Sequence, residues 1–350
     1  MPGVPVTRDG GEPAYAGAGA TYMKLPLALT ADQLRGADVA IVGAPTDETV
    51  TNRPGARYGP KAIRLADVGG GPDRPHMELG VNAFDVLSIV DYGDAQVIPA
   101  DKERTHAAIR AIVAEVCETG AIPIVLGGDH SIAHADVGAV AEHLERTKPG
   151  QTLGLVHFDA HADNAESLWG VRLSHGTPMR LLVEEGSLEG RNIVQVGLRG
   201  YWPDPEDFAW ARQHGFRWHL MDEIVDRGMD AVMDDVVDAA RSWDHMFLSF
   251  DIDVCDPAFA PGTGTPEPGG ITAREALRAV RRLSHEVGLA GMEVVEVCPP
   301  YDQSEITAFL ANRLVLEALS GLALRRLGRE PKPEQDQRAS SEQNSANAST

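Results

Sequence analysis

Short apolar runs that alternate with amphipathic segments are the feature that most constrains the fold of this chain. Runs rich in valine and isoleucine, mostly bounded by glycine, aspartate or proline, predict strands near residues 38–45, 85–93, 122–128, 153–159, 193–200, 216–220, 246–253 and 291–297. Strands that are apolar throughout are typical of a parallel sheet covered on both faces. The segments at 102–118, 132–147, 229–243, 273–287 and 305–327 have helical periodicity. This alternation predicts one three-layer α/β/α sandwich.

The chain is expected to form one domain with two extensions. The first 36 residues are rich in glycine and proline and lack periodicity, which predicts an arm on the surface. Residues 37–327 hold all the expected strands and helices, without an internal repeat or a linker. Residues 328–350 have almost no large apolar side chains to offset chain entropy, so a disordered C-terminal tail is predicted.

Charge and composition exclude several classes of protein. The chain has 31 lysines and arginines against 52 aspartates and glutamates, a net charge of −21, and no basic stripe of the kind that binds nucleic acid. An acidic body instead attracts small cations. The start of the chain lacks the features of a secretory signal, and no apolar run approaches the length of a membrane span. The three cysteines are far apart in the sequence, which is typical of reduced thiols. A cytoplasmic protein is therefore expected.

Three polar clusters follow three of the expected strands, whose ends are expected to be adjacent. They are GGDHSI at 127–132, HFDAHAD at 157–163 and SFDIDVCDP at 249–257, and they contain His130, Asp159, His161, Asp163, Asp251 and Asp253. In open α/β sheets, ligands bind beyond the carboxyl ends of the strands. Alternate residues of a strand point the same way, so each D-x-H-x-D or D-x-D run directs its side chains to one place.

Four carboxylates and two imidazoles at one place require cations, because buried like charges repel one another and no lysine or arginine accompanies them in these clusters. Two divalent ions would carry four positive charges, which balance four aspartates. The clusters therefore predict a binuclear metal site. Hard carboxylates with imidazoles and no thiolate favour Mn²⁺, with Ni²⁺, Co²⁺ or Fe²⁺ as substitutes, whereas structural zinc favours thiolates.

Other residues near the clusters are given less specific roles. Cys255 is interpreted as a small buried residue, His134 as a surface or supporting residue, and His157 as a residue packed within its strand. The first cluster alone would also be explained by a strand-to-helix turn in which Asp129 or Ser131 caps the next helix. That explanation does not extend to three clusters, each at the end of an apolar strand.

The three clusters and four further motifs resemble the ureohydrolase family, which includes arginase, agmatinase, guanidinobutyrase and proclavaminate amidinohydrolase. The resemblance runs from about Asp38 to about Leu327. The further motifs are more similar to the agmatinase branch than to arginase itself. They are RPGARYGPKAIR at 53–64, SHGTPMR at 174–180, QVGLRG at 195–200 and EVVEVCPPYD at 293–302.

The resemblance implies a fold, an assembly and a set of site residues. The family fold is one α/β/α domain around an eight-stranded, mostly parallel sheet, usually assembled as hexamers or trimers. One metal ion would be held by His130, Asp159, Asp163 and Asp251 and the other by His161, Asp159, Asp251 and Asp253, so that Asp159 and Asp251 bridge. His175 matches the family's proton-shuttle histidine, and Glu296 matches its guanidinium-binding glutamate.

The resemblance also implies hydrolysis of a small cationic guanidino compound to urea and an amine. A guanidinium is resonance-stabilised, and two metal ions that lower the pKa of a shared water would overcome its inertness. The branch motifs favour agmatine, which would give putrescine. Glu48, Thr49 and the residues from Asn164 to Trp169 depart from the branch pattern in loops expected at the mouth of the site.

Several alternatives stay open at this point. Guanidinobutyrate, guanidinopropionate and free guanidine would use the same mechanism, and a pocket partly filled by Trp169 would suit a short substrate. A catalytically silent regulatory homologue is a second class, although all six metal positions are filled. A different metallohydrolase, such as a phosphoesterase or a deacetylase, is a third. Urea release separates these classes.

Overall fold

The eight apolar runs form one sheet at the centre of the molecule. The structure, a computed structural model, describes residues 20–67 and 74–331. The strands pair in the order β2-β1-β3-β8-β7-β4-β5-β6, and every pair is parallel. They are β1 (Val39–Ala44), β2 (Ile89–Asp94), β3 (Ile122–Gly127), β4 (Leu153–Phe158), β5 (Ile193–Leu198), β6 (Arg217–Leu220), β7 (His245–Asp251) and β8 (Gly291–Val295). The predicted parallel sheet is confirmed.

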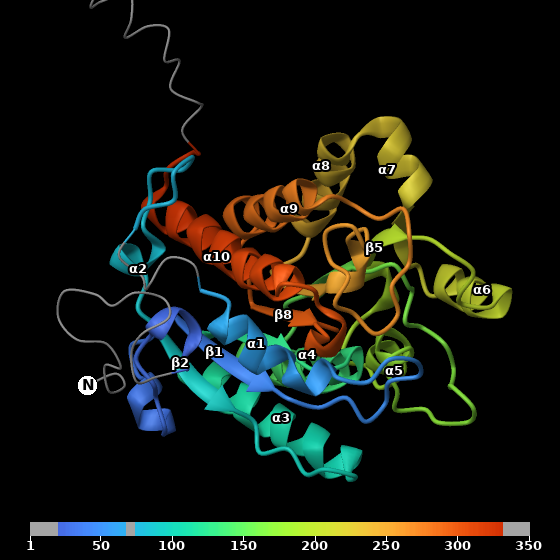
Figure 1. Ribbon diagram of the computed structural model, residues 1–350, viewed down its shortest axis with the longest axis horizontal. Helices are drawn as coiled ribbons and strands as arrows, with labels where there is room; N and C mark the ends of the chain where they lie inside the picture. Colours follow the sequence, from blue (N-terminus) through green and yellow to red (C-terminus); the bar gives the residue numbers. More distant parts are fainter. Residues whose placement is uncertain (1–19, 68–73, 332–350) are drawn as a thin grey trace, which may run out of the picture.

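Helices cover both faces of the sheet, which explains why its strands are apolar throughout. Ile124 and Leu126 of β3 pack with α8 (Met229–Ala240), α9 (Ala273–Glu286) and α10 (Ile306–Leu327), whereas Val125 packs with α3 (Lys102–Glu118), α4 (Ala133–Thr147) and α5 (Pro178–Glu184). The remaining helices are short: α1 (Gly59–Leu65), α2 (Ala83–Val86), α6 (Pro205–Gln213) and α7 (Met221–Arg227). The arrangement is the predicted three-layer sandwich (Figure 1).

Helix α10 corrects one expectation about apolar length. By length and composition it is a candidate membrane span, but 78% of its most apolar window is buried inside the protein. The expectation that no apolar run approaches a membrane span is therefore wrong. The helix is apolar because it lies between α9, α1 and the sheet, so that most of its sides face protein.

The described part of the predicted N-terminal arm, residues 20–36, packs partly against the body of the protein. Tyr22 is fully buried; its backbone amide donates to Asp91 (N to Oδ2, 2.7 Å) and its hydroxyl to the carbonyl of Asn312 (2.8 Å). Residues 1–19 of the predicted arm lie outside the described residues, as do residues 332–350 of the predicted tail. Gly328, the first residue of that tail, ends α10 in a left-handed conformation.

The strand order determines where a ligand can bind. The chain builds β1 to β3 on one side of the sheet and β4 to β6 on the other, and β7 and β8 then fill the gap between them. The carboxyl ends of β3, β8, β7 and β4 therefore meet at the point where the order reverses, which is where open α/β sheets bind ligands. The three cluster-bearing strands were expected to be adjacent, but β8 lies between β3 and β7 and adds its own end to the site.

Candidate metal centre

The candidate ligands lie at the ends of three central strands. His130 begins the turn after β3, Asp159, His161 and Asp163 follow β4, and Asp251 ends β7, two residues before Asp253. A glycine is required at position 128 in the turn before His130, because a Cβ there would lie 1.7 Å from the Thr46 carbonyl oxygen. The structure thus brings all six predicted ligands together, and none of them lies elsewhere.

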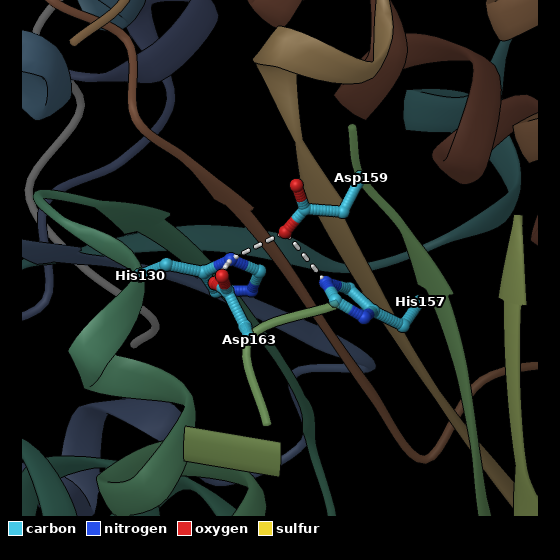
Figure 2. Close-up of side chains that lie close together, drawn as sticks. All are labelled: His130, His157, Asp159 and Asp163. Atoms are coloured by element: carbon cyan, nitrogen blue, oxygen red, sulfur yellow. Dashed lines mark hydrogen bonds and ion pairs between the residues drawn. The ribbon is translucent and has the colours of Figure 1, made fainter. Parts of the chain in front are cut away.

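His130 faces three of these carboxylates. Its Nδ1 lies 3.0 Å from Asp159 Oδ2, 2.9 Å from Asp163 Oδ2 and 3.2 Å from Asp251 Oδ2. All four side chains are almost completely buried, and Figure 2 shows His130 beside Asp159 and Asp163. One nitrogen from the end of β3 thus lies close to three oxygens from the ends of β4 and β7, an arrangement that could hold a metal ion.

The donor atoms of this group fit a cation better than they fit one another. His130 Nε2 lies 2.8 Å from Ser249 Oγ, and when it carries the ring proton, Nδ1 presents a lone pair. Nδ1 is buried and has no hydrogen-bond partner of acceptable geometry, although three carboxylate oxygens surround it. Lone pairs that converge in a buried space are stabilised by a positive ion between them.

A second group shares one member with the first. His161 Nδ1 lies 3.1 Å from Asp253 Oδ2 and 3.5 Å from Asp159 Oδ1. Asp159 therefore directs one oxygen to each group, as a bridging carboxylate would. The second oxygen of Asp251 accepts the amide of Asp253 (2.8 Å), so bridging by Asp251 stays a prediction.

The electrostatics of the cluster reflect crowded negative charge. Burial raises the pKa of Asp251 well above its ordinary value, and the charges of Asp253 and Asp159 raise it further. Burial would also raise the pKa of Asp159, but the charge of His157 and the close approach of the His130, His157 and His161 rings lower it well below its usual range. Burial, and then the charge of Asp159, raises the pKa of Asp163. Divalent ions would relieve this repulsion.

His157 is buried within its strand, as the sequence indicated, and it also contacts a residue of the cluster. Its Nε2 lies 2.8 Å from Asp159 Oδ2 (Figure 2). The Gln195 amide donates to its Nδ1 (2.9 Å) and to the Ala162 carbonyl (2.7 Å). Gln195 thus fixes the tautomer in which His157 donates its proton to Asp159. Sequence reasoning missed this pair, although His157 and Asp159 are alternate residues and point the same way.

The two residues expected to handle substrate lie next to each other beside the cluster. Glu296 follows β8 and is 1% exposed; its Oε1 accepts the amide of His130 (2.9 Å) and lies 3.3 Å from His175 Nδ1. Its Oε2 is buried and has no hydrogen-bond partner. His175 Nε2 lies 2.9 Å from the hydroxyl of Thr51, a residue that the sequence did not single out.

Two residues of the site, Asp163 and Glu296, have an unusual backbone conformation. Asp163 has a φ of 47° and Glu296 a φ of 62°, in the left-handed region that non-glycine residues rarely occupy. Such conformations cost roughly 1–3 kcal/mol each and are concentrated at functional sites. Both side chains are thereby directed into the cluster rather than along the sheet.

A cavity of about 300 Å³ leads to the cluster. Its inner wall includes His161, Asp163, Asp251 and His175. Its outer wall is largely apolar and is formed by Leu168, Trp169, Gly176 and Trp202, with the hydroxyls of Thr51 and Thr265. None of the described residues that line this cavity is a lysine or an arginine.

Trp169 stands at the tip of a two-residue hairpin over this cavity. The amides and carbonyls of Leu168 and Val171 bond to each other (3.0 and 2.9 Å), which leaves Trp169 84% exposed with a φ of 50°. Glycine, asparagine or aspartate is favoured at this position of such a turn. A large apolar side chain is thus held, exposed, in the wall of the cavity, where it could contact a ligand.

Comparison with known proteins places the chain among enzymes that act on guanidino groups. Residues 37–321 match the model of the Arginase family. The chain is 38% identical to the guanidinopropionase of Pseudomonas aeruginosa (89% of this chain, 93% of that protein) and 38% identical to the mitochondrial agmatinase of Gallus gallus (85% and 84%). The solved structure of proclavaminate amidino hydrolase from Streptomyces clavuligerus superposes with a TM-score of 0.81 at 36% identity and covers 90% of this chain and 100% of that one.

The geometry predicts that Asp251→Asn will lose most of the bound metal, because Asp251 faces His130 and is expected to contact both ions. Asp256→Asn is the matched control: Asp256 accepts backbone amides of its own loop (Ala258 N to Oδ1, 2.9 Å) and lies outside the cluster. Elemental analysis of the purified variants measures the outcome. Near-full occupancy of two ions per chain in Asp251→Asn would contradict the ligand assignment.

Proposed function

Since the chain belongs to the arginase family, whose members hydrolyse C–N bonds of linear amidines, we propose that this hydrolase of guanidino compounds acts on agmatine at a binuclear manganese centre. The products would be urea and putrescine. The observation that carries the choice of substrate is the cavity above the cluster, which offers two tryptophans and no lysine or arginine among its described residues to the far end of the substrate.

The metal assignment follows from the donor atoms. His130, Asp159, Asp163 and Asp251 would hold one ion, and His161, Asp159, Asp251 and Asp253 the other. Carboxylate oxygens with single imidazoles and no thiolate favour Mn²⁺, and Ni²⁺ or Co²⁺ are the closest substitutes. The chemistry that two such ions supply is a water of lowered pKa, able to attack an unreactive carbon at neutral pH.

Glu296 is suited to bind the guanidinium group. Its Oε2 is a buried carboxylate oxygen without a partner, while Oε1 holds the backbone of His130. A guanidinium N–H that donates to Oε2 would satisfy this oxygen and fix the reacting carbon beside the cluster. Burial raises the pKa of Glu296 first, and His175 lowers it, so a cationic partner that stabilises the ionised form suits this position.

His175 is suited to give a proton to the leaving amine. Burial lowers the pKa of His175, but the hydrogen bond and charge of Glu296 outweigh burial and raise it to about 9. A group with this pKa carries its proton at pH 7 and can release it to a more basic amine. Because Nδ1 faces Glu296 and Nε2 faces Thr51 at the cavity wall, the ring is held at both ends.

The outer cavity favours a cationic tail over an acidic one. A carboxylate tail has no lysine or arginine to pair with among the described lining residues, whereas an ammonium can lie against the face of Trp169 or Trp202. Agmatine carries such an ammonium. The assembly as a hexamer or trimer, the cytoplasmic location and the absence of nucleic-acid and membrane partners remain predictions from the sequence.

The proposed substrate predicts the order of activities across a panel. Urea release from agmatine should exceed release from 4-guanidinobutyrate and 3-guanidinopropionate by at least roughly tenfold in kcat/KM, the effect of about 1.4 kcal/mol. The panel should be measured with Mn²⁺ and with Ni²⁺. Faster hydrolysis of either guanidino acid would contradict agmatine as the substrate, and urea from none of them would contradict the reaction.

Trp169→Leu should lower kcat/KM for agmatine by roughly 2- to 30-fold, the range expected for loss of a cation–π contact. Tyr201→Leu is the control, because Tyr201 is also a highly exposed aromatic residue but does not line the cavity. Steady-state kinetics on both variants test this. Equal effects of the two substitutions would remove Trp169 from the substrate site.

Glu296→Gln should keep both metal ions and lose most activity toward every guanidino substrate. Removal of one partner of a buried charge pair costs about 2–5 kcal/mol, or roughly 30- to several-thousand-fold in kcat/KM. Metal content measured on the same preparation is the control. A loss below threefold with the metals intact would place the guanidinium elsewhere; Glu293 would then be tested before Asp302, whose oxygens already cap α10.

A further inference from the structure

Arg199 belongs to the QVGLRG motif, but the proposed reaction does not use it. The residue follows β5 and is half-buried. In the described part of the chain, its guanidinium group forms no ion pair with a carboxylate and bonds only to backbone carbonyls. The acceptors are the carbonyls of Gly197, Asp253, Val254, Glu267 and Pro268.

All three nitrogens of the guanidinium group take part, and each contacts two carbonyls. Nη2 lies 2.8 Å from the carbonyl oxygen of Asp253 and 2.6 Å from that of Glu267, and Nε lies 3.0 Å from that of Pro268. A guanidinium presents five N–H donors in a rigid, planar fork. Because no carboxylate pairs with its charge, the group acts here as a rigid connector between backbone segments.

The side chain of Arg199 connects two segments of the site. One segment contains Asp253, an expected ligand of the second ion. The other contains Glu267, two residues after Thr265, which lines the cavity and whose hydroxyl lies 3.2 Å from Asp253 Oδ2. The guanidinium therefore fixes the backbone on both sides of the Asp253 carboxylate.

The backbone of Arg199 is bonded to a third segment of the site. Its amide donates to the carbonyl of Ala160 (3.0 Å), and the amide of Ala160 donates to Asp253 Oδ1 (3.1 Å). Ala160 lies between Asp159 and His161, which are expected ligands of the same second ion. Arg199 thus holds together the two strand ends that supply these ligands.

His130, the histidine expected at the first ion, is held by other residues. Its Nε2 lies 2.8 Å from Ser249 Oγ, and its amide donates to Glu296 (2.9 Å). Among the described residues, Arg199 makes no hydrogen bond to the turn that carries His130. An effect of Arg199 on metal binding is therefore expected at the second ion only.

We propose that Arg199 is a positioning residue of the second metal ion: it holds the Asp253 carboxylate toward His161 before the ion binds. This inference rests on the binuclear centre of the proposed function. Lysine cannot replace arginine in this role, because an ammonium places its donors at one point, whereas the carbonyls of Asp253 and Pro268 face different nitrogens.

The experiment is calorimetric titration of metal-free wild type and Arg199→Lys with Mn²⁺, together with their melting temperatures. Loss of a residue that orients a metal ligand lowers affinity by 10- to 100-fold, so Arg199→Lys should weaken one Mn²⁺ site by roughly this factor and leave the other within about threefold. His161→Ala identifies the sites, because it removes the imidazole of the second ion. Arg199→Lys added to His161→Ala should not change the affinity that remains.

Arg325→Lys is the matched control. Arg325 also bonds to backbone carbonyls, those of His285 (3.1 Å) and Glu286 (3.2 Å), but it lies beside the first residues of β1 and β3, at the edge of the sheet opposite the cluster. Its replacement should leave both Mn²⁺ affinities unchanged.

The outcomes separate this inference from the proposed function. Equal weakening of both sites in Arg199→Lys would overturn the positioning role, and so would a lower melting temperature with unchanged Mn²⁺ affinities, which would indicate a role in the fold alone. A wild type that binds fewer than two ions would overturn the binuclear centre, and this inference with it.

Hydrogen–deuterium exchange of the wild type tests the same claim even where Arg199→Lys does not fold. The amide of Ile271 donates to Val254 (3.1 Å) and that of Asp256 to Ile271 (2.9 Å), within the loop that Arg199 holds. These amides should be protected in the metal-free protein, and Mn²⁺ should slow their exchange by less than about threefold. Free exchange until Mn²⁺ is added would overturn the positioning role.

Discussion

Repulsion among buried carboxylates at the carboxyl edge of the sheet is the constraint on which the rest of this structure depends. Asp159, Asp163, Asp251 and Asp253 are all almost completely buried, and none of them forms an ion pair with a lysine or arginine of the described chain. Apolar strands hold them there, so the arrangement cannot relax by moving a side chain to solvent. A fold that concentrates negative charge in this way is stable only when cations or protons enter the site.

Because the candidate ligands are buried, other buried residues hydrogen-bond to them or contact them and hold them in place. His157 donates to Asp159 in the tautomer fixed by Gln195, Ser249 and Glu293 lie behind His130, and Glu296 holds the backbone of His130. Metal-ligating groups are generally oriented by such outer partners. The loop that carries Thr51 is tied to the same turn, because the amide of Thr49 donates to Asp129 (3.0 Å). Ligand geometry and the cavity wall are therefore set by one network.

Much of the fold was predictable from the sequence because its elements are long and strongly periodic. All eight strands and the five long helices lie within a few residues of their predicted bounds. Five short helices, α1, α2, α5, α6 and α7, were not predicted, although α1, α5 and α6 have proline in the first turn, a signal of helix starts. The strand predicted from residue 85 begins only at Ile89, after the short helix α2.

The site was predictable where its residues follow one another along a strand end. The six candidate ligands, Glu296 and His175 were all identified from local motifs and the resemblance, and the structure brings them together. Thr51 and Gln195 were missed because their roles depend on contacts between elements distant in sequence. The position of Trp169 in the cavity wall likewise could not be predicted from the sequence and is visible only in the structure.

Electron paramagnetic resonance of the protein titrated with Mn²⁺ tests the central claim most directly. Two ions bridged by Asp159 would lie about 3.5–4 Å apart, as in other two-metal sites. The account predicts two bound Mn²⁺ per chain and the spectrum of an exchange-coupled pair once the second equivalent is bound. A single Mn²⁺ per chain, or two ions with uncoupled six-line spectra, would contradict it.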